Sequence, residues 1–336
     1  MDNNTLITVA MSVYNAEKYI EETIESILVQ TYENFELIII NDGSTDGSLE
    51  IINKYKKIDK RIILINRENK GLVTSLNECI EKANGEYIVR MDADDICLPS
   101  RFEEQLKFMQ ENQLSLCGTW VETFDEKNSI NIWTYPEGHT DILFRSFFMS
   151  SFAHPSVMIK KNVFDTLKYE NKVAEDYKLW CDILANGYKT GNIQKVLLKY
   201  RLHDGQITQN QVKELIYSVN DTGLDFVKKI NPNCIAIVEN AIDIQSNCSF
   251  SKLNKLIKDI LNYSREREIN KENLYFIIKT LYRNASPKSP ITYYKYFKAT
   301  NGMKRNLKEE SNLCFKSLIF VNRDSKVYQF LKKIMD

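Results

Sequence analysis

The end of one apolar run carries acidic residues in a spacing that suits a metal ion. The run Tyr87–Met91 leads directly into Asp92, Ala93, Asp94 and Asp95. Alternate side chains of an extended strand point to opposite faces, which places Asp92 and Asp94 together and Asp95 opposite them, capping the following loop. Adjacent carboxylates repel each other unless a cation lies between them. The spacing therefore predicts a divalent-metal site, and solvated aspartates at a strand end are the alternative.

Four residues at the end of an earlier apolar run could bind a nucleobase. Ser12, Val13, Tyr14 and Asn15 close the run Leu6–Val13 and lead into a helical pattern. An aromatic ring and a polar helix cap at a strand end offer a flat surface and hydrogen-bonding groups to a base. A helix start that is simply capped by Asn15 is the alternative interpretation.

Charged residues follow the next two predicted strands. Asp42 lies in the turn 41–44, where its carboxylate could accept the N3–H of uracil or serve an ordinary Asx turn. Arg67 and Lys70 precede Gly71, and their charge would add to the field of a helix N-terminus near a nucleotide or its diphosphate. Solvated basic side chains are the alternative for these two residues.

Two further groups lie in the second half of the chain. Glu175 and Asp176 open a helix with a strongly apolar face, and helix capping alone would explain both carboxylates. Arg201 and His203 follow a strand. A guanidinium can contact phosphate there, and an imidazole can complete the coordination of a metal ion. His154, which precedes a proline, is interpreted as a structural residue.

Strands and helices alternate through the first third of the chain and would position these residues. Apolar β-rich runs predict strands, and amphipathic spacing predicts helices between them. The predicted strands are Leu6–Val13, Phe35–Ile40, Ile62–Ile65 and Tyr87–Met91, with helices over residues 15–30, from residue 44 to about 56, 72–83 and 100–112. Asn84 and Gly85 are expected to cap the third helix. This order implies βαβ units in a doubly wound, mostly parallel sheet.

Later segments predict a mixed region and then a helical one. The mixed region has strands at Leu116–Phe124, Ser156–Ile159 and Val196–Tyr200, and helices at Asp141–Phe148, Lys161–Thr166 and Asp176–Asn186. After about residue 210, amphipathic helices are predicted at Val212–Ile230, Ile235–Gln245, Ser251–Ser264, Lys271–Arg283 and Val327–Met335. We therefore expect an α/β domain over residues 1–210 and an all-α region over residues 211–336.

Composition narrows the classes of protein. The 336 residues carry 45 basic and 45 acidic side chains, so no global charge attracts nucleic acid. The seven cysteines form no C-x-x-C pair, which is typical of buried thiols in a reducing compartment. The N-terminus lacks a signal-peptide pattern, and no apolar run approaches the roughly 20 residues that span a bilayer. These features predict a cytoplasmic globular protein without a nucleic-acid partner.

Several motifs occur together and in order: VAMSVYNAEKYIEETIESILVQTYENFELIIINDGSTDGS, NKGLVTSLNECIEKANGEYIVRMDADD, AHPSVMI, AEDYKLW and YRLHDGQIT. Through them the chain resembles the nucleotide-sugar glycosyltransferases of the large inverting family 2, which have the GT-A fold. The resemblance covers roughly residues 5–210. It leaves the helical region outside.

The resemblance implies a role for each candidate residue. Residues 12–15 would line a uridine pocket, with Asp42 on the uracil and Asp92 and Ala93 beside the ribose. Asp94, with Asp92 and His203, would hold Mn²⁺ or Mg²⁺ bridging the two phosphates. Asp176 would be the general base that deprotonates the acceptor hydroxyl, its pKa tuned by its neighbour Glu175. The Q-x-x-R-W pattern of processive synthases is absent from the sequence.

The resemblance thus implies transfer of a hexosyl or N-acetylhexosaminyl group from a UDP-sugar to a saccharide hydroxyl in surface-polysaccharide synthesis. Two other classes stay open. A nucleotidyltransferase would normally have a Gly-rich N-terminal loop, and the segment Leu6–Asn15 contains no glycine. A non-catalytic glycan-binding scaffold would not need Asp92, Asp94 and Asp176.

The C-terminal third predicts a possible membrane contact. Its amphipathic end could rest on the anionic inner face of the plasma membrane, where lipid-linked acceptors reside. A helical bundle with solvated lysines is the alternative. The basic residues concerned are Lys304, Arg305, Lys308, Lys316, Arg323, Lys326, Lys332 and Lys333.

Overall fold

The computed structural model of the protein describes residues 4–125, 130–203, 212–286, 289–301, 303, 310 and 313. The chain forms two compact units, Met1–Thr222 and Gly223–Asp336. They divide within helix α8 (Val212–Ile230), and the domain boundary expected at residues 210/211 stays a prediction. The predicted helix Val327–Met335 and the eight basic residues of the predicted membrane contact lie outside the described residues.

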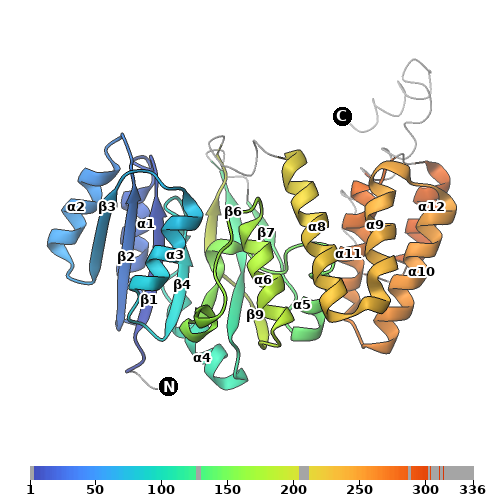
Figure 1. Ribbon diagram of the computed structural model, residues 1–336, viewed down its shortest axis with the longest axis horizontal. Helices are drawn as coiled ribbons and strands as arrows, with labels where there is room; N and C mark the ends of the chain where they lie inside the picture. The colour runs from blue at the N-terminus through green and yellow to red at the C-terminus, as the bar shows by residue number, and fades with distance from the viewer. Residues whose placement is uncertain are drawn as a thin grey trace, which may run out of the picture. The chain divides into compact units, whose positions relative to one another are not determined.

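A single sheet with the strand order β3-β2-β1-β4-β8-β6-β9-β5 organises the first unit, and β7 pairs with β6. The strands are β1 Ile7–Val13, β2 Phe35–Asp42, β3 Ile62–Arg67, β4 Tyr87–Met91, β5 Ile96–Cys97, β6 Leu116–Phe124, β7 Asn131–Trp133, β8 Met158–Lys160 and β9 Thr190–Arg201. Strands β1 to β4 are mutually parallel and lie side by side in Figure 1. This confirms the predicted mostly parallel sheet.

Antiparallel pairing begins beyond β4. Strand β8 runs antiparallel to both β4 and β6, while β6 and β9 are parallel. The short strands β5 and β7 were not among the predicted elements, because two or three residues are too few to show a period. The parallel strands β1, β2 and β4 are almost entirely buried, as expected when helices cover both faces of a sheet.

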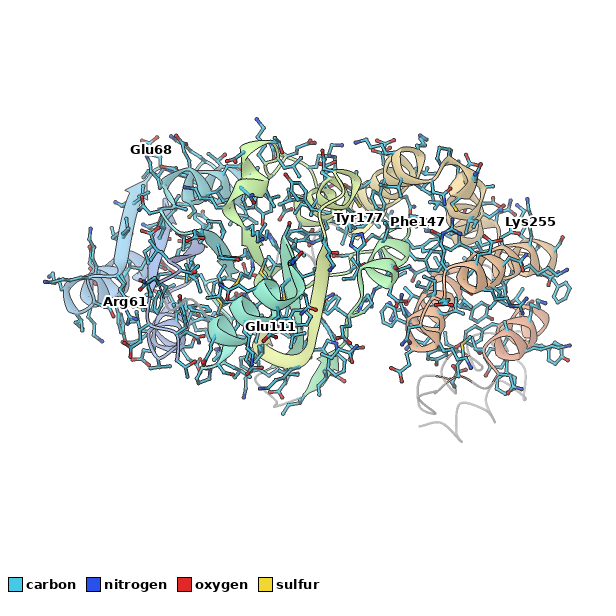
Figure 2. All side chains as sticks on the ribbon, turned by 90° about the horizontal axis from the view of Figure 1, so that it is seen from below. Arg61, Glu68, Glu111, Phe147, Tyr177 and Lys255 are labelled. Atoms are coloured by element: carbon cyan, nitrogen blue, oxygen red, sulfur yellow. The ribbon has the colours of Figure 1, made fainter. Side chains whose placement is uncertain are left out.

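The helices of the first unit pack apolar faces on this sheet. They are α1 Ile20–Leu28, α2 Ser48–Ile58, α3 Leu72–Lys82, α4 Arg101–Asn112, α5 His139–Arg145 and α6 Glu175–Ala185, with 3-10 turns at His154–Ser156 and Lys161–Asp165. Ile20, Ile24 and Ile27 of α1 are fully buried in the core. The Tyr177 hydroxyl of α6 donates to the Ser146 carbonyl at 2.7 Å, beside Phe147 (Figure 2).

Gly85 corrects one expectation. Helix α3 ends at Lys82, and its C-cap Ala83 is already extended. Gly85 does not have the positive φ of a left-handed cap. Instead its N–H donates to the Thr8 hydroxyl at 2.9 Å, and a Cβ there would lie 2.5 Å from the Thr8 nitrogen. The glycine is therefore required by the close approach of the chain to β1.

The second unit consists of helices. Besides the end of α8 it contains a 3-10 turn at Pro232–Cys234, α9 Ile235–Asn247, α10 Phe250–Glu266, α11 Lys271–Asn284 and α12 Pro290–Ala299. The predicted helices α8 to α11 are confirmed, and α12 is additional. Leu253, Leu256 and Ile260 form the buried stripe of α10. Within the described part of the chain, no helix has the length and apolar character needed to cross a membrane.

Gly85→Ala is expected to destabilise the first unit. The added methyl meets backbone atoms of β1, which cannot move aside as a flexible side chain can, so unfolding should cost roughly 2 kcal/mol less. Thermal unfolding followed by circular dichroism measures this loss. Gly138→Ala is the matched control, because a Cβ at Gly138 has nothing within 4 Å. Equal midpoints for the two variants would contradict the close-approach argument.

Candidate active site

Three carboxylates converge where β4 ends. Strand β4 stops at Met91, and Ala93 and Asp94 form a turn. Carboxylate oxygens of Asp92, Asp94 and Asp95 all lie within 4.8 Å of one another. Asp92 and Asp94 come together as predicted. The expectation that Asp95 points to the opposite face is wrong, because the turn replaces strand alternation after Met91.

Asp95 fastens a distant strand to this turn. Its Oδ1 accepts the backbone N–H of Arg201 on β9 at 2.9 Å, so it does not cap the next loop. Its Oδ2 is buried and has no hydrogen-bond partner among the described residues. Burial, followed by the charges of Asp92 and Asp94, raises the pKa of Asp95 well above its ordinary value.

The triplet fits a hard divalent cation. Burial and the charge of Asp92 raise the pKa of Asp94, and the His203 Nε2 lies 2.8 Å from the Asp94 Oδ2. Carboxylate oxygens are the ligands that Mg²⁺ and Mn²⁺ prefer. The raised pKa values of Asp94 and Asp95, and the Asp95 Oδ2 without a hydrogen-bond partner among the described residues, show that the cluster lacks the positive charge that such an ion would supply. Asp92 and Asp94, with His203 beside them, are the residues placed to hold it.

Arg90 is a site residue that the sequence analysis missed. It lies on β4, is only 4% exposed, and forms an ion pair with Asp92 through Nη1. Its positive charge also partly opposes the burial that raises the pKa values of Glu175 and Asp176. Its Nε is buried without a hydrogen-bond partner among the described residues. A charged residue in a buried strand, two positions before an aspartate, was the available signal.

Glu175 and Asp176 occupy the first turn of α6. Ala174 before them has a left-handed backbone with φ of 61°, and no side chain caps the helix. Burial, followed by the charge of Asp176, raises the pKa of Glu175 to about 7. Burial also raises the pKa of Asp176, and the charges of Arg90 and Asp92 reach the same carboxyl. Arg90 therefore acts electrostatically on both carboxyls of the pair and, through its ion pair, on Asp92 of the triplet.

His154 lies at the edge of the acidic pair. Its Nε2 is 2.9 Å from the Tyr169 hydroxyl, and its Nδ1 is 3.8 Å from a Glu175 oxygen. Burial and the charge of Arg90 lower its pKa well below the ordinary value, so the imidazole is neutral at physiological pH. It positions Glu175 through contact, which agrees with its expected structural character.

Asp42 is held in a fixed cradle at the end of β2. The residue is 2% exposed, its Oδ1 accepts the Lys70 N–H at 2.8 Å, and its Oδ2 accepts the Gly71 N–H at 2.9 Å. Arg67 forms an ion pair with Asp42 and donates from Nε to Glu78 at 2.8 Å. Arg67 therefore orients Asp42, while the Lys70 side chain is exposed. Direct contact of either basic group with a nucleotide stays a prediction.

The residues after β1 line the neighbouring edge. Ser12 and Val13 end the strand, and the Tyr14 side chain is 54% exposed. Asn15 has a φ of 50°, and its Oδ1 accepts the Thr45 N–H at 2.8 Å. The predicted helix cap at Asn15 is wrong, because a turn over residues 16–19 precedes α1. Asn15 instead ties this loop to the one after β2.

Arg201 is enclosed by protein groups. Its guanidinium lies between the rings of Tyr19 and Phe124, at 4.6 and 4.5 Å from their centroids. Its Nε donates to the Asp94 carbonyl at 2.8 Å, and its Nη2 pairs with Glu22 at 2.5 Å. The side chain therefore supports the turn that carries Asp94. A contact between Arg201 and phosphate stays a prediction.

The mostly parallel sheet, with a carboxylate cluster at the end of its strand β4, has the architecture expected of a GT-A glycosyltransferase. The model of the family described as Glycosyl transferase family 2 matches residues 8–167. An uncharacterized glycosyltransferase of Haemophilus influenzae is 34% identical over 288 residues, which cover 78% of this chain and 86% of that protein. The chain belongs to glycosyl transferase family 2.

Other relatives have names that state a reaction or a biosynthetic process. The Escherichia coli protein WfaP, named a UDP-Glc:alpha-D-GlcNAc-diphosphoundecaprenol beta-1,3-glucosyltransferase, is 32% identical over 219 residues, covering 64% of this chain and 84% of WfaP. The O-antigen biosynthesis glycosyltransferase WbnJ of Escherichia coli is 34% identical over 232 residues, covering 67% of this chain and 90% of WbnJ. The chain thus groups with family members of the surface-polysaccharide type.

Solved structures share the fold. TarS residues 1–349 of S. aureus, in complex with UDP-GlcNAc, align with a TM-score of 0.58 and 15% identity, covering 92% of this chain and 91% of that one. The mannosyltransferase PcManGT of Pyrobaculum calidifontis, in complex with GDP-Man and Mn²⁺, gives a TM-score of 0.54 and 13% identity, covering 98% and 86%. These likenesses confirm the predicted GT-A architecture.

The raised pKa of Glu175 predicts how stability changes with pH. Its carboxyl binds more protons in the folded protein than in the unfolded chain between pH 4.5 and about 7. The free energy of unfolding should therefore fall as pH rises through this window. Glu175→Gln removes the titration, so relative to this variant the wild type should lose roughly 2 kcal/mol between pH 5 and 8.

Urea denaturation at both pH values, in EDTA, measures this difference. Glu111→Gln is the matched control, because the Glu111 side chain of α4 is 62% exposed (Figure 2) and should follow the wild type. Parallel pH profiles for the wild type and Glu175→Gln would show that Glu175 is not held protonated in the folded protein.

Proposed function

We propose that the protein is an inverting, metal-dependent glycosyltransferase that moves a sugar from a UDP-linked donor to a saccharide hydroxyl in surface-polysaccharide synthesis. One observation carries the proposal. Asp92, Asp94 and Asp95 converge within 4.8 Å at the end of β4, where Arg90 pairs with Asp92. The Arg90 N–H donates to the Val157 carbonyl at 3.1 Å, three residues after His154, and the His154 ring lies 3.8 Å from Glu175, the neighbour of the candidate base Asp176. The name of WfaP, with its UDP-Glc donor and diphosphoundecaprenol acceptor, supports the class of donor and acceptor.

The donor nucleotide would lie along the ends of β1, β2 and β4. Asp42 keeps capacity on Oδ2 to accept the N3–H of uracil, since a carboxylate accepts about four hydrogen bonds. Tyr14 and Asn15 would border the base, and Asp92 with Ala93 would meet the ribose. The fixed cradle of Asp42 favours this role, because a preorganised acceptor binds without losing side-chain freedom.

Asp92 and Asp94, with His203 beside them, would hold Mn²⁺ or Mg²⁺. When bound, the ion would neutralise negative charge that develops on the departing diphosphate. The Mn²⁺ complex of PcManGT supports a divalent ion in this fold. Arg90 pairs with Asp92 and would orient that carboxylate toward the phosphates.

Asp176 would accept the proton of the acceptor hydroxyl as that oxygen attacks the anomeric carbon. The bond from this carbon to the diphosphate oxygen breaks at the same time, so the diphosphate leaves from the opposite face and the configuration inverts. The raised pKa of Asp176 makes it a stronger base than an ordinary aspartate. Glu175, with a pKa of about 7, would hydrogen-bond the acceptor beside it.

The acceptor would be a growing surface polysaccharide that is lipid-linked, and the reaction would take place in the cytoplasm. Contact with the inner face of the plasma membrane through the C-terminal basic residues stays a prediction, since those residues lie outside the described chain.

Asp176→Asn should separate donor binding from transfer. The amide keeps the shape of the side chain but cannot take a proton, so transfer should fall about 100-fold or more while metal-dependent binding of the UDP-sugar stays intact. Isothermal titration and a coupled UDP-release assay measure the two quantities. Asp182→Asn, on the same helix, is the matched control and should transfer normally. Transfer at the wild-type rate by Asp176→Asn would assign the base to another residue.

Asp94→Asn should abolish the part of donor binding that depends on Mn²⁺. The variant loses a charged oxygen ligand, so Mn²⁺ should no longer add to the thermal stabilisation produced by a UDP-sugar. A thermal-shift titration with and without Mn²⁺ measures this. Glu104→Gln is the control, since Glu104 pairs with Lys195 outside the acidic cluster. An unchanged Mn²⁺ effect in Asp94→Asn would overturn the assigned metal site.

A further inference from the structure

An apolar strip lies on the surface at one edge of the sheet. Every residue of β7 is exposed: Ile132 and Trp133 are 55% and 42% exposed, and Ile130, just before the strand, is 60% exposed. Trp133 projects from one face of the sheet and Ile132 from the other, because side chains alternate along a strand. Clustered exposed apolar side chains on an edge strand are unusual in a monomeric domain, because edges are normally protected by charge. The strip is therefore a candidate for binding.

Trp133 is supported by an aromatic residue from another strand. Trp133 pairs with Val121 on one side of β6, and Tyr200 pairs with Thr123 on its other side. Both aromatic side chains therefore project from the same face of the sheet. Their ring centroids are 5.3 Å apart with a tilt of 38°, so Tyr200 fixes the plane of the exposed indole.

Tyr200 connects this pair to the acidic triplet. Burial, together with the charges of Asp92, Asp95 and Asp94, raises the pKa of the Tyr200 phenol. The next residue along β9, Arg201, donates its backbone N–H to Asp95. Tyr200 thus lies beside the acidic triplet, and its partner Trp133 is exposed to solvent.

The position of the pair separates it from the proposed nucleotide site. Asp42 and residues 12–15 lie on β2 and β1, on one side of β4 in the strand order, whereas β6, β9 and β7 lie beyond β8 on the other. A molecule that binds to the aromatic pair is therefore not the nucleotide donor but the other reactant. In a glycosyltransferase that reactant is the acceptor.

We propose that Trp133, supported by Tyr200, is a stacking platform for a pyranose ring of the saccharide acceptor. This inference rests on the proposed function. One face of a pyranose presents C–H groups with partial positive charge, which complement the electron-rich face of indole, while the hydroxyls stay hydrated. The partial exposure of Trp133 suits a chain whose other rings remain in water. Trp133 is a binding residue and takes no part in bond breaking.

Trp133→Ala tests the platform. With the p-nitrophenyl glycoside of glucose, galactose or N-acetylglucosamine that the wild type glycosylates fastest, the acceptor KM should rise about tenfold or more. The donor KM, the Mn²⁺-dependent binding of the UDP-sugar and the thermal midpoint should not change. Trp133→Phe keeps an aromatic face and should restore most of the affinity. Ile58→Ala, which alters a 70% exposed apolar residue on α2, should leave every quantity unchanged.

Intrinsic fluorescence gives a second readout. The acceptor glycoside should quench or shift the emission of the wild type and should not do so in Trp133→Phe. An unchanged acceptor KM in Trp133→Ala overturns the proposal. The proposal is also overturned if the acceptor KM of Trp133→Ala is unchanged while the molar mass of the protein in solution, or its binding to anionic phospholipid vesicles, is altered. The exposed apolar residues would then bind a second copy of the chain or a lipid. Failure of the wild type to glycosylate any glycoside would instead refute the proposed function.

Discussion

Repulsion among three carboxylates is the constraint on which the site depends. Asp92, Asp94 and Asp95 crowd within 4.8 Å, and their mutual repulsion and burial raise the pKa values of Asp94 and Asp95. Fixed donors offset part of that cost: the Arg90 guanidinium, the Arg201 amide and the His203 ring. The offset is incomplete, since one Asp95 oxygen has no partner among the described residues. Such a cluster gains most from a divalent cation, which also makes the site attractive to a diphosphate.

Buried guanidinium groups hold this costly arrangement in place. Arg90 pairs with Asp92 at the end of β4, and Arg67 pairs with Asp42 at the end of β2. Strand β1 lies between these two strands. Arg101, which is fully buried, donates to the backbone carbonyls of Arg90 and Val157 at 3.1 and 3.4 Å and so joins β4 to the segment before β8. Planar guanidinium groups suit such positions, because several fixed donors satisfy several acceptors at once. The acidic residues are thereby positioned before any ligand arrives.

The sequence predicts the parts of the site that depend on residue type and strand order. Asp92 and Asp94 come together as expected, because both follow the same strand, β4. The role expected for Asp176, in the first turn of α6, stays a prediction. Asp95 and Asn15 were misplaced, since strand alternation and capping rules stop applying where a turn intervenes. Arg90 was read as part of an apolar run, although it forms an ion pair with Asp92. Trp133 could not be assigned, because a three-residue strand has no period and its partner Tyr200 is 67 positions away.

The sheet also separates a fixed half from an adaptable half. Strands β1, β2 and β4 are almost wholly buried and are paired with other strands on both edges, so the groups at their ends cannot shift without disturbing the core. Strand β7 is wholly exposed and pairs with β6 at the sheet edge. Changes of length or residue type there leave the core intact. Under the proposed function, donor and metal chemistry would belong to the rigid half, and selection of the acceptor would belong to the half that the fold leaves free to vary.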